Sequence, residues 1–284
     1  WESVVARLPS GWRPDFVALQ LAYTHVPAGF WNAPVPLVGL AGDWNLLWHH
    51  YRRCLTRCER ILTDRSGVER FAAAGLTHAR YFNQYGCRAD DADWPWPETK
   101  RDIDILFVGN MHDAVQRERL PWLARLANLG NRWNVVIRTG TYGDDYRRLL
   151  ARARIVFNRS IRGECNLRTF ETACAGALLF QEAGNREVPE FLEDRKEYVA
   201  YTDENLETRL EFYLTHEPER RAIAAAARTK VRSCRYADLW NRAVLEIESD
   251  LPELRKHVGC RPRPEAREQA LARVWQELCS DRRR

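Results

Sequence analysis

The sequence predicts an α/β protein in which two Rossmann-like parallel-sheet domains are followed by C-terminal helices. Short apolar runs rich in β-branched residues, such as Ile155–Phe157, alternate along the chain with segments whose apolar residues recur at helical spacing. Strands that alternate with helices form parallel sheets, because each helix provides the crossover to the next strand. The length of 284 residues is enough for two domains of ordinary size.

The N-terminal domain is expected to cover residues 1–95. Its expected strands are Phe16–Leu21, Val35–Leu40, Arg60–Thr63 and Ala79–Phe82, and its expected helices are Trp44–Cys58 and Val68–Ala74. Residues 86–103 are expected to link the two domains. The stretch Trp94–Pro97 within them cannot be a regular helix, because each proline restricts the residue before it.

The C-terminal domain is expected to cover residues 96–250, and an arginine-rich helical tail is expected over 251–284. The expected strands are Ile103–Val108, Trp133–Arg138, Ile155–Phe157, Ala177–Phe180 and Glu197–Tyr201. The expected helices are Ala114–Leu129, Asp145–Arg152, Asn166–Cys174, Glu204–Leu214, Pro218–Ser233, Tyr236–Asp250 and, in the tail, Pro264–Ser280.

The composition indicates which partners and which cellular compartment to expect. The net charge of +5 is modest and no basic stripe runs along the chain, so we expect no nucleic-acid partner. No apolar run approaches the ~20 residues needed to span a bilayer, so we expect no membrane span. Eight scattered cysteines without a CxxC pair favour a reducing cytoplasm. His50, Cys54 and Cys58 are residue types that bind zinc, and they are spaced four residues apart on one expected helix. The outer two would lie ~12 Å apart, too far to bind the same ion, so we expect no metal site.

A polar loop after the strand Ile155–Phe157 is the candidate binding site. It contains Asn158, Gly163, Glu164 and Asn166. In βαβ units, ligands lie beyond the carboxyl ends of the strands, next to helix N-termini. The unpaired N–H groups and the positive dipole end of the helix that opens near Asn166 favour an anion such as a diphosphate.

Arg168 and Glu171 lie three residues apart in this helix and therefore on one face. The arginine is suited to a phosphate and the carboxylate to a pair of sugar hydroxyls. An exposed ion pair between the two side chains accounts for the spacing equally well, because such pairs are common and contribute under about 1 kcal/mol. The spacing alone leaves both interpretations open.

Gly109, Asn110, Tyr142 and Asp43 follow other expected strands. Gly109 and Asn110 end the first strand of the C-terminal domain, where a glycine lets a phosphate approach the backbone closely. Tyr142, in the turn after the next strand, either stacks on a base or covers the core. Asp43 follows the second strand of the N-terminal domain, where it either acts on an acceptor hydroxyl or caps the next helix.

The run GECNLRTFETACAGALLFQE resembles the donor-site signature of GT-B glycosyltransferases, in particular the spore-maturation (CgeB-type) group, and the resemblance extends from about Pro14 to about Ala243. The matching residues are Gly163, Asn166, Arg168, Phe170, Glu171, Cys174 and Gly176. Related retaining families carry two spaced glutamates, of which the second binds the nucleotide ribose. Glu171 matches the second glutamate, whereas Gly163 occupies the place of the first and Glu164 is one residue out of register.

The resemblance implies a GT-B fold with an incomplete N-terminal domain, and transfer of a sugar from a nucleotide-diphosphate sugar to a glycan, protein or small-molecule acceptor. Asp43 and Arg168 would be catalytic. The nucleotide sugar would be bound by Gly109, Asn110, Tyr142, Asn158, Gly163, Glu164, Asn166, Arg168 and Glu171. Neither a metal nor a cofactor is expected, because the helix N-terminus and Arg168 supply the positive charge. The alternative is a noncatalytic nucleotide- or protein-binding module, which the missing first glutamate favours.

Overall fold

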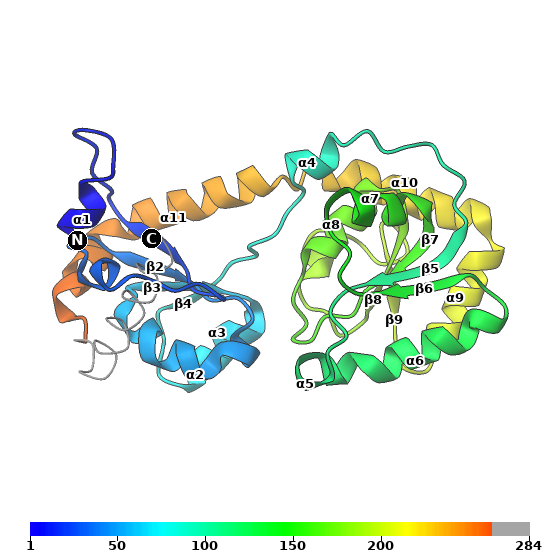
Figure 1. Cartoon of the computed structure of the whole chain (residues 1–284), viewed down its shortest axis with the longest axis horizontal. Helices are drawn as coiled ribbons and strands as arrows, with labels where there is room; N and C mark the ends of the chain where they lie inside the picture. The colour runs from blue at the N-terminus through cyan, green and yellow to red at the C-terminus, as the bar shows by residue number, and fades with distance from the viewer. Residues whose placement is uncertain (263–284) are drawn as a thin grey trace, which may run out of the picture. The chain divides into compact units, whose positions relative to one another are not determined.

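The computed structural model describes residues 1–262, which form two compact units (Figure 1). Within the described residues, unit 1 comprises Trp1–Phe82 and residues 243–262, and unit 2 comprises Asn83–Arg242. Each unit contains one sheet of parallel strands. The α/β architecture with two parallel sheets and C-terminal helices, predicted from the alternating pattern, is therefore confirmed.

The sheet of unit 1 has its four strands in chain order. They are β1 (Val17–Gln20), β2 (Leu37–Leu40), β3 (Arg60–Thr63) and β4 (Ala79–Tyr81). The helices α2 (Trp44–Cys54) and α3 (Arg65–Ala73) contribute the fully buried Tyr51 and Phe71 to its core. The predicted helix Trp44–Cys58 is too long, because Leu55–Arg57 forms a tighter 3₁₀ turn.

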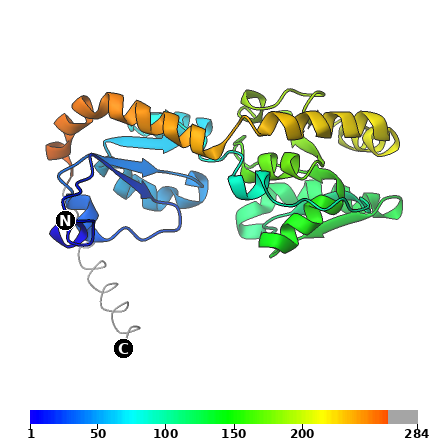
Figure 2. The same ribbon diagram turned by 90° about the horizontal axis from the view of Figure 1, so that it is seen from above.

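A long C-terminal helix, α11 (Tyr236–His257), joins this unit along its second half, and Figure 2 shows it from above. Ion pairs connect it and the residues after it to unit 1, at 2.5 Å between Arg60 and Asp250 and at 2.6 Å between Arg261 and Glu59. The short helix α1 (Glu2–Val5) opens the chain. The predicted helix Pro264–Ser280 lies outside the described residues.

The sheet of unit 2 has the strand order β6-β5-β7-β8-β9. The strands are β5 (Ile103–Val108), β6 (Val135–Arg138), β7 (Ala153–Phe157), β8 (Leu178–Glu182) and β9 (Val199–Tyr201). From β5 the chain passes first to β6 on one side and then to β7 on the other. The strand order thus reverses between β5 and β7, and ligands of doubly wound folds bind at the carboxyl ends of strands beside such a point.

Helices cover both faces of this sheet, as Figure 1 shows. One face carries α7 (Gly143–Arg152), α8 (Leu167–Cys174) and α10 (Glu217–Val231), and the other carries α6 (Leu120–Asn128) and α9 (Leu206–Thr215). Phe107, Phe157 and Phe180 of three adjacent strands are fully buried in the core shared with α6 and α9. Strand residues buried in this way hold the carboxyl ends of the strands in fixed positions.

The predicted continuous helix Ala114–Leu129 is wrong. Instead, α5 (Asp113–Gln116) is followed by a 3₁₀ turn at Arg117–Arg119, and α6 begins afterwards with Pro121 in its first turn. Proline in a helix interior removes a hydrogen bond and clashes with the preceding turn, whereas the first turn tolerates it. The break at Pro121 therefore restarts the helix and leaves Arg119 in the turn before it.

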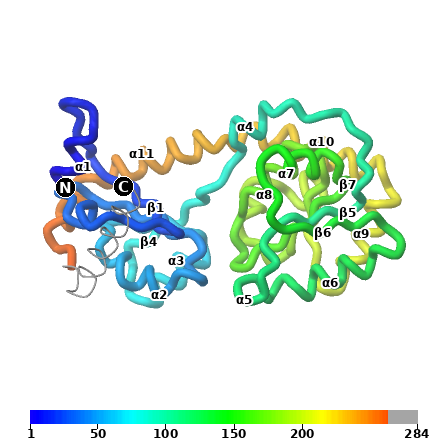
Figure 3. Tube along the Cα trace, in the orientation of Figure 1, coloured from blue at the N-terminus to red at the C-terminus, as the bar shows by residue number. Residues whose placement is uncertain are grey.

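The segment before β5 belongs to unit 2. The Cys87 N–H donates to the Cys234 carbonyl, and the Tyr236 N–H donates to the Cys87 carbonyl, each at 2.9 Å. Figure 3 lets the chain be followed from this pairing through α4 (Ala89–Ala92) to β5. The boundaries between the compact units thus fall after residues 82 and 242, whereas the sequence predicts domain boundaries after residues 95 and 250. The domain assignment stays a prediction.

Residues 1–262 contain neither a candidate membrane span nor a candidate metal site. None of their helices is both long and apolar enough to cross a membrane. Within the same range, no group of three or more His, Cys, Asp or Glu side chains is arranged to hold a metal ion. Cys54 and Cys58 are buried in the core of unit 1.

Candidate functional site

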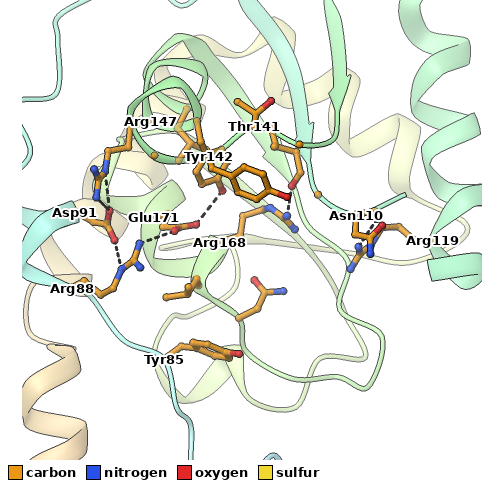
Figure 4. A pocket seen from close by; sticks show the side chains of 18 residues that line it. Tyr85, Arg88, Asp91, Asn110, Arg119, Thr141, Tyr142, Arg147, Arg168 and Glu171 are labelled. Atoms are coloured by element: carbon orange, nitrogen blue, oxygen red, sulfur yellow. Dashed lines mark hydrogen bonds and ion pairs between the residues drawn. The ribbon is translucent and has the colours of Figure 1, made fainter. Parts of the chain in front are cut away.

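A cavity of about 470 Å³ lies at the carboxyl ends of β5 and β6, bounded by the first turns of α7 and α8 (Figure 4). Its volume is within the range of small-molecule sites, about 300–1,000 Å³. All its lining residues belong to unit 2. They are Tyr85, Arg88, Asp91, Val108, Gly109, Asn110, Arg119, Gly140, Thr141, Tyr142, Gly143, Tyr146, Arg147, Leu150, Asn166, Leu167, Arg168 and Glu171.

Two arginines make one part of the cavity cationic. Arg168 donates from Nη1 to Asn158 Oδ1 at 2.6 Å and from Nη2 to the Val108 carbonyl, whereas Arg119 donates to the carbonyls of Asn110 and Arg159 at 3.2 and 2.9 Å. Within residues 1–262 neither forms an ion pair with a carboxylate, and Nε of each has no hydrogen-bond partner. Burial, followed by the charge of Arg168, lowers the pKa of Arg119 to about 10. Two held cations that form no ion pair within the described residues favour an anionic ligand.

Gly109 is required because of Arg168. A Cβ atom at Gly109 would lie 2.9 Å from Nη2 of Arg168 and 2.9 Å from the ring of Phe107. The guanidinium also lies over that ring, 5.1 Å from its centroid. The missing side chain of Gly109 thus makes room for the arginine, and a close approach of phosphate to its backbone stays a prediction.

The N-terminus of α8 faces the cavity through Asn166 and Leu167. Asn166 is the N-cap residue, yet its side chain makes no capping hydrogen bond. Its Oδ1 instead accepts from Nδ2 of Asn158 at 3.0 Å, while its own amide donates back to Asn158 at 3.3 Å. The Asn166 carbonyl accepts from the Thr169 N–H at 3.1 Å, but its side chain occupies no first-turn N–H of α8, which favours an anion at this end of the helix.

An ionic network forms the other part of the cavity. Glu171 accepts from Arg88 Nη2 at 3.0 Å and from the Tyr146 hydroxyl at 3.1 Å. Arg88 also pairs with Asp91 at 2.8 Å, and Asp91 pairs with Arg147 at 3.0 Å. Figure 4 shows this chain of contacts on one side of Arg168, with Asn110 and Arg119 on the other.

The exposed Arg168–Glu171 ion pair, one of the two interpretations of their spacing, is not what the structure shows. The ion-pair partner of Glu171 is Arg88, and the Glu171 side chain is only 12% exposed. Burial raises the pKa of Glu171, and the neighbouring charge of Asp91 raises it further, against the opposing effect of Arg88. A carboxylate kept in such a place gains from additional donors, such as sugar hydroxyls.

The cavity brings together six of the residues selected from the sequence, namely Gly109, Asn110, Tyr142, Asn166, Arg168 and Glu171. Tyr142 is 81% exposed, so it does not cover the core, and stacking on a base stays a prediction. Tyr142 reaches the cavity because it lies at the end of the turn that connects β6 to α7.

Asn158, Gly163 and Glu164 do not line the cavity. Asn158 is fully buried behind Arg168, where it also donates to Gln181 Oε1 at 2.7 Å. Gly163 has a φ of +78° in the loop before α8, and Glu164 accepts from the N–H of Arg162 at 2.8 Å. These contacts hold the loop, so a direct role of the three residues in binding stays a prediction.

Asp43 belongs to unit 1, where Ala41 and Gly42 separate it from the end of β2. It occupies the N-cap position of α2 in a left-handed conformation, with φ 47° and ψ 36°, and its side chain makes no capping hydrogen bond. The N-cap position is confirmed, but the capping bond is not formed. A non-glycine residue at positive φ is uncommon, and aspartate is among the residues that tolerate it.

The sequence interpretation did not select Arg119, Arg88, Asp91, Arg147 or Tyr146. Arg119 was assigned to the interior of a continuous helix, and Pro121 two residues later was the signal that the helix restarts there. Tyr146 packs against the core of unit 2, and its hydroxyl also donates to Glu171. The sequence also did not single out Tyr85 and Thr141, which are further lining residues.

Comparison with known families gives one match. A family model described as glycosyl transferase-like matches residues 98–246. The matched range includes the lining residues from Val108 to Glu171 but not Tyr85, Arg88 and Asp91. No curated protein sequence matches the chain.

Solved structures of glycosyltransferases are similar in fold. A glycosyltransferase from Rickettsia africae has 15% identity and a TM-score of 0.53, covering 84% of this chain and 76% of that one. An alpha-glucosyltransferase in complex with UDP-glucose and DNA containing an abasic site has 9% identity and a TM-score of 0.56, with coverage of 82% and 80%. Anabaena HepE in complex with UDP-glucose has 14% identity and a TM-score of 0.51, with coverage of 76% and 72%. This likeness concerns the fold alone, and it confirms the predicted GT-B fold class.

Proposed function

The chain belongs to the glycosyl transferase-like family, and we propose that it transfers a sugar from a nucleotide-diphosphate sugar to an acceptor. One observation carries the proposal: Arg119 and Arg168 line the cavity beside a helix N-terminus, without a carboxylate partner among residues 1–262. A diphosphate supplies the charges that these groups lack. Solved structures of similar fold hold UDP-glucose, which supports this class of donor. The CgeB-type group stays a proposal that rests on the quoted residues.

In this proposal an acceptor oxygen bonds to the anomeric carbon of the sugar as the bond between that carbon and the diphosphate breaks. The proton of the acceptor hydroxyl passes to a base, for which Asp43 is the candidate, and negative charge builds up on the departing diphosphate. Arg168, Arg119 and the N–H groups of α8 stabilise that charge, because they are already held in place by hydrogen bonds to Asn158 and backbone carbonyls. Glu171 accepts hydrogen bonds from the ribose. These groups provide the charge stabilisation that a divalent metal otherwise gives, so we propose that transfer is metal-independent. A cytoplasmic location stays a prediction from the scattered cysteines.

Nucleotide binding without metal is the first expected result. UDP, GDP or TDP should raise the melting temperature in the presence of EDTA, because a ligand that binds only the native state stabilises it by mass action, by about 2.7 kcal/mol at 100 Kd. Differential scanning fluorimetry with each nucleotide, with and without Mg²⁺, measures this. No shift with any of the three at millimolar concentration would contradict the assignment of the donor site.

Asp43→Asn tests the proposed acceptor-side base. Asparagine tolerates the same left-handed conformation, and no capping bond is lost, so the melting temperature should stay unchanged. Hydrolysis of the nucleotide sugar, with water replacing the acceptor, should slow by about 10²-fold or more if Asp43 is the base. An unchanged rate would remove Asp43 from the mechanism.

The noncatalytic alternative is favoured by one feature. Gly163 stands where related families carry the first glutamate, and the carboxylate of Glu164 is engaged with Arg162 in its own loop. The same hydrolysis assay on the unmodified protein separates the two functions. Nucleotide binding without any turnover of UDP-, GDP-, TDP- or CMP-sugars would support the noncatalytic module.

A further inference from the structure

A second cavity, of about 320 Å³, lies at the amino ends of the strands of unit 2, opposite to the carboxyl ends that form the candidate site. We name it the arginine pocket; it is lined mainly by Lys100, Arg101, Arg154, Glu217, Arg220 and Arg221. Lys100 and Arg101 precede β5, and Arg154 is the second residue of β7. Since β5 and β7 are paired and parallel, from Ile103 opposite Ala153, these residues meet at one edge of the sheet. The first two turns of α10 provide the remainder.

Positive charge exceeds negative charge in the arginine pocket. The one lining carboxylate, Glu217, pairs with Arg221 at 2.8 Å and lies 3.9 Å from Arg220. Asp104 pairs with Arg154 at 2.9 Å. Five cations against these two carboxylates leave an excess of three charges. Within the described part of the chain, neither Lys100 nor Arg101 forms an ion pair.

Several of these cations are built into the fold. Arg101 donates to the carbonyls of Ala153 and Ala175 at 2.5 and 2.6 Å, and Arg220, which is 3% exposed, donates to the Tyr213 carbonyl at 3.2 Å. Because these contacts fix the guanidinium groups, the cations cannot move apart to relieve their mutual repulsion. A pocket that holds like charges close together is arranged for a ligand of opposite charge.

The lowered pKa values of Arg101 and Arg220 agree with this crowding of positive charge. Burial, together with the charges of Arg220, Arg228 and Arg221, lowers the pKa of Arg101 to about 10. Burial likewise lowers the pKa of Arg220, with Arg154 and Arg221 adding to the effect against Glu217. The cations thus disfavour one another, and a bound anion would offset that cost.

We propose that the arginine pocket binds a small multivalent anion of the phosphate or diphosphate class. Its volume is at the lower end of the range for ligand sites, which fits a phosphate or diphosphate group better than a whole nucleotide. The N-terminal end of α10 contributes its positive dipole end at Glu217 and Pro218. The proposal does not rest on sugar transfer, because no residue of the arginine pocket lines the candidate donor site.

Inorganic pyrophosphate is the probe. Calorimetric titration of the unmodified protein should give two binding events, one in each cavity. The double variant Lys100→Ala/Arg221→Ala removes two exposed cations of the rim, so its fold should be kept. This variant should bind pyrophosphate in the arginine pocket about tenfold to a hundredfold more weakly. Its binding of pyrophosphate in the candidate donor site should stay unchanged. Arg168→Ala should show the reverse pattern, which separates failure of one site from failure of the other.

A control variant removes the same charge elsewhere. Arg148→Ala/Lys196→Ala deletes two exposed cations of unit 2 that line neither cavity, and both binding events should stay unchanged. The proposal is overturned if the unmodified protein shows no pyrophosphate binding that survives Arg168→Ala. Equal weakening by both double variants would also overturn it, because the effect would then reflect net charge and not a site.

Discussion

Replacing Arg168 by alanine is expected to weaken the binding of a nucleoside diphosphate by about 1.5–3 kcal/mol, because a charged hydrogen bond to the phosphates is lost. The affinity for the corresponding nucleoside should stay unchanged, since it carries no phosphate. In the unmodified protein, Asn158 and the Val108 carbonyl already hold the guanidinium, so little side-chain freedom is lost when the ligand binds. Calorimetric titration with nucleoside and nucleoside diphosphate measures both affinities.

Gly109→Ala is the matched variant, because it keeps the charge of Arg168 but displaces the guanidinium from its position. The new Cβ atom would overlap Nη2 of Arg168, so diphosphate affinity should fall although no cation is removed. Gly130→Ala serves as the control, because a Cβ atom there meets nothing within 4 Å. Normal diphosphate affinity in both Arg168→Ala and Gly109→Ala would exclude the arginine from the phosphate site.

The unit β7–α8–β8 could be predicted from the sequence because its signals are local. The apolar strand runs, the polar loop and the spacing of Leu167 and Phe170 each depend on neighbours within one turn or one strand. The structure confirms this unit and places Arg168 and Glu171 in one cavity. Local periodicity was enough to predict that Arg168 and Glu171 share a site, because the helix presents one face to the carboxyl ends of the strands.

The partners of these two residues could not be predicted in the same way. Arg88 is 83 positions from Glu171, and Val108 is 60 positions from Arg168. The i,i+3 rule describes an isolated helix surface, where Arg168 and Glu171 would be each other's nearest charges. In the folded chain a backbone carbonyl at the end of β5 is closer for the arginine, and Arg88 is closer for the glutamate. Tertiary contacts between distant segments therefore determine the site, and spacing in the sequence does not contain them.

Glu171→Gln is expected to weaken nucleoside and nucleoside diphosphate binding alike, each by about 1.5–3 kcal/mol, because the ribose is common to both ligands. Glutamine preserves the shape of the site: Arg88 keeps its ion pair with Asp91 at 2.8 Å, and the Tyr146 hydroxyl can still donate to the amide oxygen. The result thus differs from that of Arg168→Ala, which affects only the ligand with phosphates. Asp145→Asn, at an exposed carboxylate on α7, is the matched control for loss of one negative charge.

The pH dependence gives a second test of Glu171, with a definite sign. Burial raises its pKa in the free protein, so this carboxyl group contributes stability that is fully present below the usual glutamate pKa and is lost as the pH rises through the raised value. The ionised carboxylate accepts stronger hydrogen bonds from ribose hydroxyls than the protonated group does, so nucleoside affinity should increase over the same pH interval in which the contribution of Glu171 to the stability of the free protein falls. Chemical unfolding and nucleoside titration across that interval should show both changes in the unmodified protein. In Glu171→Gln the rise in affinity should be lost and the fall in stability should be smaller but not absent, because burial also raises the pKa of Glu182. A nucleoside affinity that depends equally on pH in both proteins would show that another group binds the ribose.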